Sequence, residues 1–175
     1  MPRIIELETY NPSWPSQFQE EAATLERLIP GRIITTYHIG STAIKGIYAK
    51  PTIDILPVVN SIEEIDDCQE ILRSNGYEPL GENGIPGRRY FIKRKQEEHL
   101  VHLHFFQCGH SEIERHLLFI AYLNAHPGDA DAYSKLKQEL AVQYQLDPQG
   151  YNQAKTAFIQ SIDRKALAWK SLGNQ

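Results

Sequence analysis

The sequence predicts a single α/β domain over residues 1–175, with strands and helices mixed at first and a C-terminal helical section from about residue 111. Three observations predict this class. Runs rich in β-branched residues alternate with segments of helical periodicity, and only helical signals follow them. A chain of 175 residues with 41% hydrophobic residues also suits one core.

The first elements are a helix and two strands. Apolar residues recur at helical spacing from about Trp14 to Ile29, where a proline and a glycine end the helix. Residues 32–40 and 51–59 are rich in β-branched residues and are bounded by turn-forming residues, which predicts two strands joined by a loop.

The middle of the chain predicts a further helix and more extended segments. Ser61 and Glu64 form an S-x-x-E capping box, and the helix that it starts ends at Asn75-Gly76. A short extended piece follows, and two β-rich runs after it predict an antiparallel hairpin. The extended segments are residues 77–80, 88–95 and 99–106.

Three helices are expected to finish the chain. Ser111 with Glu114 is a second capping box, residues 126–128 are a break, and Asp147-Pro148 is a cap followed by a first-turn proline. The last helix is expected to carry one apolar stripe at helical spacing. The stripe consists of Tyr151, Ala154, Phe158, Ile162, Ala166 and Trp169.

Composition and charge exclude several classes of function. The formal net charge of −4 lacks the basic surplus of a general nucleic-acid binder, so a small anionic ligand is the better expectation. No apolar segment reaches the length of a membrane span and no secretory signal is recognisable, so a cytoplasmic protein without a membrane partner is expected. The two cysteines, Cys68 and Cys108, are expected to be free thiols.

The first candidate site is the segment from His38 to Asp54. A strand ends at His38 in a Gly40-Ser41 turn, Thr42 comes next, and Asp54 follows inside an apolar strand. Such a turn exposes backbone N–H groups and a hydroxyl to phosphate, and a strand aspartate facing the same cleft binds a metal that bridges phosphates. This pattern is typical of nucleotidyl transfer and makes Asp54 the candidate catalytic residue. The alternative for Gly40-Ser41 is an ordinary turn with a helix cap.

Asp54 and two histidines form a candidate metal set. A carboxylate between two isoleucines is costly unless it meets a cation or hydrogen-bond donors, and the alternative is a structural aspartate bonded to the backbone or to Lys50. In the strand sequence His102-Leu103-His104, alternation places both imidazoles on one face. With Asp54 they suit zinc, manganese or iron, or they contact phosphate and act as acid and base. A solvent-facing pair of histidines is the alternative.

A glycine-rich loop and two arginines form the third candidate. Residues 81–87 leave backbone donors open, and Arg88 and Arg89 follow where the loop meets a strand, as in a phosphate clamp. Successive strand residues point to opposite faces, so only one of the two arginines is expected to face the ligand. Lys50, just before a proline, is a further candidate to neutralise ligand charge.

Several motifs resemble the GrpB family across nearly the whole chain. They are HIGSTAIKGIYAKPTIDIL, YNPSWPSQF, GRRYF, HLHFF and the HPxxAxxY pattern of residues 126–133. The resemblance implies a nucleotidyltransferase-like fold, a mixed β-sheet flanked by helices. By that resemblance Gly40 and Ser41 match the superfamily turn, Asp54 matches its first strand carboxylate, and the strand of residues 102–104 takes the place of its third acidic position. Two positions after Asp54, Leu56 stands where a second metal carboxylate would be.

Three functions compete at this stage. The first is a nucleotidyltransferase-like protein that binds a nucleotide or other phosphorylated ligand with Mg²⁺ or Mn²⁺, with Zn²⁺ as a further candidate. The second is a non-catalytic phosphate-ligand-binding or regulatory module with the same fold, which Leu56 favours. The third is a two-histidine, one-carboxylate metal site for hydrolysis or redox chemistry. Whether the protein is an enzyme, which acceptor it uses and how it assembles stay open.

Overall fold

The computed structural model describes residues 4–173, and they form two compact units. The sheet unit comprises Pro12–Gly40 and Thr52–Glu114. The helical unit comprises residues 4–11, 41–51 and 115–173 of the described chain. The expectation of a single domain over residues 1–175 stays a prediction.

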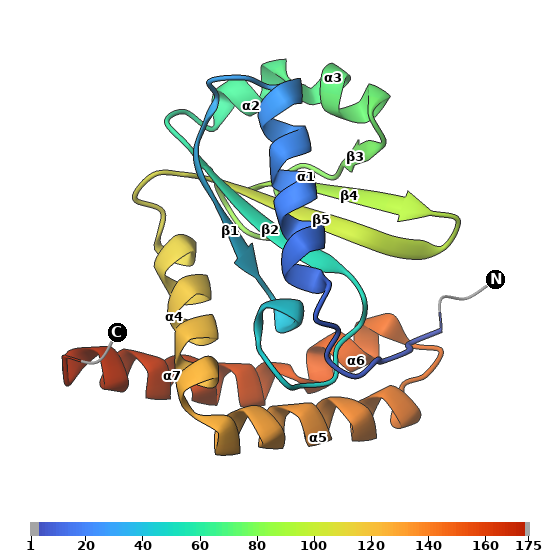
Figure 1. Cartoon of the computed structure of the whole chain (residues 1–175), viewed down its shortest axis with the longest axis vertical. Helices are drawn as coiled ribbons and strands as arrows, with labels where there is room; N and C mark the ends of the chain where they lie inside the picture. Colours follow the sequence, from blue (N-terminus) through green and yellow to red (C-terminus); the bar gives the residue numbers. More distant parts are fainter. Residues whose placement is uncertain (1–3, 174–175) are drawn as a thin grey trace. The chain divides into compact units, whose positions relative to one another are not determined.

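Five strands form one mixed sheet in the sheet unit, in the order β1-β2-β5-β4-β3 (Figure 1). β2 pairs parallel with β5, whereas the other neighbouring strands pair antiparallel. The β4–β5 pair is the predicted hairpin, and the mixed sheet flanked by helices is confirmed. The strands are β1 (Ile33–Ile39), β2 (Ile53–Val59), β3 (Tyr77–Pro79), β4 (Arg89–Lys95) and β5 (Glu98–Gln107).

Helix α1 (Trp14–Leu28) lies across one face of this sheet (Figure 1). Its buried Phe18 stacks on the His38 ring of β1, with 5.0 Å between the ring centroids. His38 pairs with Ile55 of β2, so alternation turns both side chains toward α1. Asp54, one residue earlier in β2, therefore points from the opposite face of the sheet.

The predicted helix after β2 is broken into two short helices. α2 (Glu63–Asp67) and α3 (Gln69–Ser74) are separated by one residue. The Ser61 hydroxyl donates a hydrogen bond to the Glu63 carboxylate at 2.8 Å, and no side chain caps α2. The predicted capping box of Ser61 and Glu64 is therefore wrong, because the helix begins two residues after Ser61 and leaves its hydroxyl to another partner.

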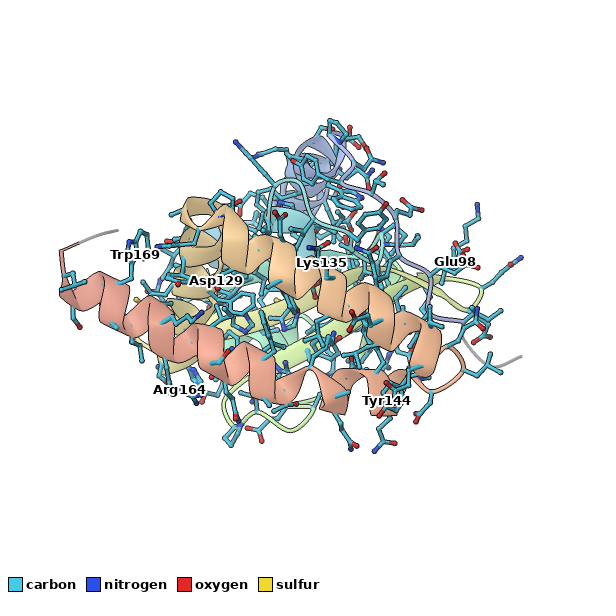
Figure 2. All side chains as sticks on the ribbon, turned by 90° about the horizontal axis from the view of Figure 1, so that it is seen from below. Glu98, Asp129, Lys135, Tyr144, Arg164 and Trp169 are labelled. Carbon is cyan, nitrogen blue, oxygen red and sulfur yellow. The ribbon has the colours of Figure 1, made fainter. Side chains whose placement is uncertain are left out.

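Within residues 4–173, four helices follow the sheet, not the three that the sequence predicted. They are α4 (Ser111–Ala125), α5 (Pro127–Gln143), α6 (Pro148–Ala154) and α7 (Thr156–Ser171). In the helical unit α5 and α7 run antiparallel and side by side (Figures 1 and 2). The predicted last helix is interrupted at Lys155, and its stripe divides between two cores. Tyr151 packs with Ile5 and Leu140, whereas Ile162 and Ala166 pack in the larger cluster.

The helix caps were predicted with mixed success. Asp147 caps α6 as expected, because its carboxylate accepts a hydrogen bond from the Gly150 N–H at 2.9 Å. Ser111 does not cap α4, since it is already the first helical residue. The His110 ring nitrogen Nδ1 accepts from the Glu112 N–H at 3.2 Å instead. A histidine thus takes the place that the S-x-x-E pattern assigned to serine.

Two smaller expectations concern the thiols and the membrane. Cys68 and Cys108 are both free, as predicted. Within residues 4–173, no helix combines the length and apolar character needed to cross a membrane.

Candidate metal and ligand site

Asp54 lies near the start of β2 on the face of the sheet opposite α1, and its side chain is 24% exposed. The parallel pairing of β2 with β5 sets Asp54 beside His102, and alternation along β5 brings His104 to the same face. One oxygen, Asp54 Oδ1, lies 3.1 Å from His102 Nδ1 and 3.0 Å from His104 Nε2. The structure therefore gathers the three residues that the sequence proposed as metal ligands.

Hydrogen bonds reach Asp54 through both histidines. An ionised carboxylate only accepts, so each ring donates its nearer N–H to Oδ1. On one side His102 Nε2 lies 2.8 Å from His99 Nδ1. On the other side His104 Nδ1 lies 3.3 Å from Arg88 Nη1. Two chains of polar groups thus converge on one carboxylate oxygen.

The Arg88 contact fixes the tautomer of His104. A guanidinium has no acceptor, so His104 Nδ1 must accept and the ring proton must reside on Nε2, facing Asp54. Burial lowers the pKa of His104 below its usual value, with the Arg88 and His102 charges acting in the same direction and Asp54 opposing them. His104 is therefore a neutral donor at physiological pH.

Asp54 itself stays ionised. Burial alone would raise the pKa of its carboxyl group, but the hydrogen bonds from His102 and His104 outweigh burial and hold the pKa well below the ordinary range. The site therefore presents a carboxylate at every physiological pH, bonded to two rings on one of its oxygens.

The donor set fits a transition metal better than Mg²⁺. Asp54, His102 and His104 each offer one ligand atom, and these atoms lie within 4.8 Å of one another. Imidazole suits zinc, manganese and iron, whereas Mg²⁺ prefers oxygen ligands. The residue that would supply a second carboxylate on this strand face is the buried Leu56. Of the expected metals, Mn²⁺ and Zn²⁺ therefore suit this donor set better than Mg²⁺, and the identity of the metal stays a prediction.

Arg88 opposes coordination by His104. A histidine that binds a metal through Nε2 carries its proton on Nδ1 and donates it to an acceptor. Arg88 offers only donors to that nitrogen, so coordination by His104 requires this contact to break. His102 has no such conflict, because its outer partner is another imidazole that can donate or accept. Asp54 and His102 are the better first ligands.

Gly40 keeps the backbone close to Asp54. Its φ of 74° is in the left-handed region, and a Cβ at this position would lie 2.5 Å from Asp54 Oδ2. Glycine is thus required by backbone conformation and by the carboxylate together. Ser41 and Thr42 continue into the 3₁₀ turn Ser41–Ala43, which belongs to the helical unit, and Thr42 is buried there.

The two arginines have separate roles. The Arg88 side chain is 6% exposed and lies over the Tyr90 ring, with its Cζ 4.6 Å from the ring centroid. Its Nε and Nη2 donate to the carbonyls of Glu82 and Asn83, so Arg88 ties the glycine-rich loop to the site. Arg89 instead forms a two-pronged ion pair with Asp66.

The two remaining predicted residues are His38 of β1 and Lys50 of the helical unit. His38 stacks under α1 on the opposite face of the sheet, and burial lowers its pKa while the Asp54 charge opposes that shift. Lys50 belongs to the helical unit, where its ammonium lies 4.3 Å from the centre of the Tyr151 ring. His38 and Asp54 thus point from opposite faces of the sheet.

Sequence reasoning missed His99 and Tyr90. His99 precedes His102 by three residues, which breaks strand alternation, because a register shift lies between Lys93 and Arg94 on the paired strand. Tyr90 pairs with His104 across β4 and β5, and its ring lies 5.1 Å from that of His104. The occurrence of three histidines within six residues, at positions 99, 102 and 104, was the available signal for His99.

The fold and this cluster define an α+β protein with an aspartate–histidine site on a mixed sheet. Residues 4–165 match the family described as GrpB protein, and the chain belongs to this family. The UPF0157 protein YqkA of Bacillus subtilis is 43% identical over 96% of this chain and 49% of its own length. Glutamate-rich protein GrpB of Alkalihalophilus pseudofirmus is 34% identical over 89% of this chain and 92% of its own.

A solved structure of the same family supports the fold. Conserved protein GrpB from Enterococcus faecalis superposes with a TM-score of 0.89 and 38% identity, over 93% of this chain and 98% of that chain. The Cid1 poly(U) polymerase is a distant match, with a TM-score of 0.47 and 13% identity over 74% of this chain and 45% of that chain. The chain spans about half the length of YqkA, so the activity of the longer protein is a separate question.

Proposed function

We propose that this chain binds a phosphorylated small molecule, in the first instance a nucleotide, together with a divalent metal at the Asp54 cluster. The observation that carries the proposal is the convergence of His102 and His104 on Asp54 Oδ1, at 3.1 and 3.0 Å. An ionised, partly exposed carboxylate between two imidazoles is a ready pair or triad of metal ligands.

The residues divide the work as follows. Asp54 and His102 hold the metal, and His104 joins them where Arg88 releases its ring. The metal would supply positive charge to phosphate oxygens. Gly40 leaves the space beside Asp54 Oδ2 free of a side chain. Arg88 holds the glycine-rich loop of residues 81–87 against the cluster through its two carbonyl contacts.

This proposal has two versions. In one the protein catalyses nucleotidyl transfer, and in the other it binds the ligand without catalysing a reaction. Leu56 favours the second version, because two-metal phosphoryl transfer uses several carboxylates to hold both ions. The GrpB resemblance favours the transfer reaction, since the matching turn and first strand carboxylate are those of nucleotidyltransferases. The two forms differ in whether pyrophosphate is released.

Thermal unfolding in the presence of nucleoside triphosphates tests the binding step. Each nucleotide is combined with Mg²⁺, Mn²⁺, Zn²⁺ or a chelator, and a ligand at 100 times its Kd stabilises the fold by about 2.7 kcal/mol. We expect a shift that requires Mn²⁺ or Zn²⁺ and that Asp54→Asn abolishes. Asp67→Asn, at an exposed carboxylate of α2, is the matched control and should keep the full shift.

The outcomes separate the readings. A full, metal-dependent shift in Asp54→Asn would refute the metal role of Asp54. Release of pyrophosphate by the wild type, lost in Asp54→Asn and kept in Asp67→Asn, would establish transfer. A shift without pyrophosphate release for any acceptor would establish the non-catalytic module.

A further inference from the structure

Three lysines gather around two tyrosines in the helical unit. Lys137 is on α5, Lys155 ends α6, and Lys50 is in the segment that precedes β2. The ammonium groups of Lys50 and Lys155 lie 4.3 and 4.2 Å from the centre of the Tyr151 ring. The Lys137 ammonium lies 4.7 Å from the centre of the Tyr133 ring. We call Lys50, Lys137 and Lys155 the lysine cluster.

Lys137 forms the buried base of the lysine cluster. Its side chain is 1% exposed, although lysine is almost never fully buried unless it is paired. Its ammonium donates to the carbonyl of Tyr48, a contact that uses one of its three protons. Lys50 and Lys155 are only partly buried, so an incoming ligand meets them first.

The two charged groups that act on Lys137 are both positive. Burial, together with the nearby charges of Lys155 and Lys50, lowers the pKa of Lys137 to about 7. Tyr151 supplies no negative charge, because burial raises the pKa of its phenol and keeps it protonated. Burying the Lys137 cation beside two charges of the same sign is unfavourable, and a bound anion would offset this cost.

Backbone support alone does not account for a charged residue here. Lys137 holds the Tyr48 carbonyl, but the Tyr48 N–H is already held by the Ser134 hydroxyl of the same helix at 2.9 Å. A neutral donor at position 137 would serve the carbonyl without the cost of a buried charge. The hydrogen bond to Tyr48 therefore does not explain why position 137 carries a positive charge.

We propose that the lysine cluster is an anion-binding site for a phosphate group of a small ligand. Phosphate is held by ammonium groups as point charges, and three of them around a pair of aromatic rings offer both charge and a ring surface for an attached organic group. The site uses no residue of the Asp54 cluster and needs no metal. It therefore goes beyond the proposed function and stands or falls separately from it.

Calorimetric titration with inorganic phosphate and with pyrophosphate tests the site. The titrations use the full chain at pH 6.5 with a chelator, at constant ionic strength set by chloride, so that a non-specific salt effect does not appear as binding. We expect saturable binding by the wild type. Lys137→Met should weaken it by about tenfold or more, and Lys50→Met and Lys155→Met by roughly three- to tenfold each.

The matched control is Lys135→Met. Lys135, labelled in Figure 2, is an exposed lysine on the same helix. It is two residues from Lys137, and this spacing turns the two side chains to different sides of α5. The control should bind phosphate as the wild type does. Asp54→Asn should also bind it unchanged, which separates this site from the proposed metal site.

Two results would overturn the proposal. One is the absence of saturable phosphate or pyrophosphate binding by the wild type. The other is wild-type affinity in Lys50→Met and Lys155→Met, which keep the buried Lys137 and so remain informative where Lys137→Met does not fold. A lower melting temperature of Lys137→Met with unchanged phosphate affinity would likewise assign Lys137 a purely structural role.

Discussion

The two polar clusters of this chain differ in the groups that surround their buried charge. On the sheet, Asp54 is surrounded by donors, and His102, His104 and Arg88 form an unbroken set of contacts around it. In the helical unit, the Lys137 ammonium lies near the Tyr133 ring, the Tyr48 carbonyl and two further cations. The Asp54 carboxylate is thus met by hydrogen-bond donors, whereas the Lys137 ammonium is buried beside two charges of its own sign.

This contrast predicts opposite effects of neutralising substitutions. Removing a partnered charge leaves its partners unpaired and costs stability. Removing a charge held among like charges relieves repulsion and desolvation, and often stabilises a fold. Melting temperatures of matched variants therefore distinguish the two kinds of cluster even before a ligand is known.

The largest effect is expected from Lys137→Met. Methionine is a flexible apolar side chain that can occupy the buried position of Lys137 without a charge. The free energy of unfolding at pH 6 should therefore rise by about 1–4 kcal/mol. Chemical denaturation of the variant and of Lys135→Met measures it. A clear loss of stability in Lys137→Met alone would show that its bond to Tyr48 outweighs the buried charge.

The same substitution makes a prediction about pH. The folded pKa of Lys137, about 7, is below the unfolded value of 10.5, so between these values the unfolded chain holds the extra proton. Wild-type stability should thus rise with pH through this window, as the folded amine becomes neutral and its penalty is relieved. The advantage of Lys137→Met should be greatest below pH 7 and shrink by pH 9.

The sequence predicted contacts between residues that are close along the chain better than contacts between residues that are far apart along it. Periodicity and alternation placed α1, the strands and the shared face of His102 and His104, because such patterns are local. The helix break at Lys155 was missed, since its apolar stripe continues across it. The lysine cluster was missed for another reason: its members are far apart along the chain and only tertiary packing unites them.

The arginine pair shows the same limit at closer range. Alternation predicted that only one of Arg88 and Arg89 would face the ligand, but it did not say which. Arg88 is held near the Asp54 cluster because its guanidinium donates to the carbonyls of Glu82 and Asn83 in the folded loop. Arg89 is held away from that cluster by its ion pair with Asp66 of α2. The orientations of both arginines depend on partners outside the strand.

An intermediate effect is expected from Arg88→Met, which tests whether Arg88 limits metal binding. Losing the donor to His104 Nδ1 allows this ring to coordinate through Nε2, so Zn²⁺ affinity should rise by about tenfold. Titration against a competing chelator measures it. Stability should fall by about 1–3 kcal/mol, because two loop carbonyls lose their donor. Weaker Zn²⁺ binding would instead make Arg88 a residue that positions the ligands.

The smallest effect is expected from Arg89→Ala, which sharpens the comparison within the sheet unit. The Arg89–Asp66 pair is two-pronged but largely open to solvent on the Asp66 side, so its loss should cost about 0.2–1 kcal/mol. Arg89 lowers the pKa of Asp66, so this contribution is present above the unfolded pKa of aspartate and is lost as the pH falls through the folded value. Urea unfolding at pH 7 and pH 3 should show the difference only at pH 7. Zn²⁺ affinity should not change, and a change comparable to that of Arg88→Met would mean that both arginines act on the Asp54 cluster.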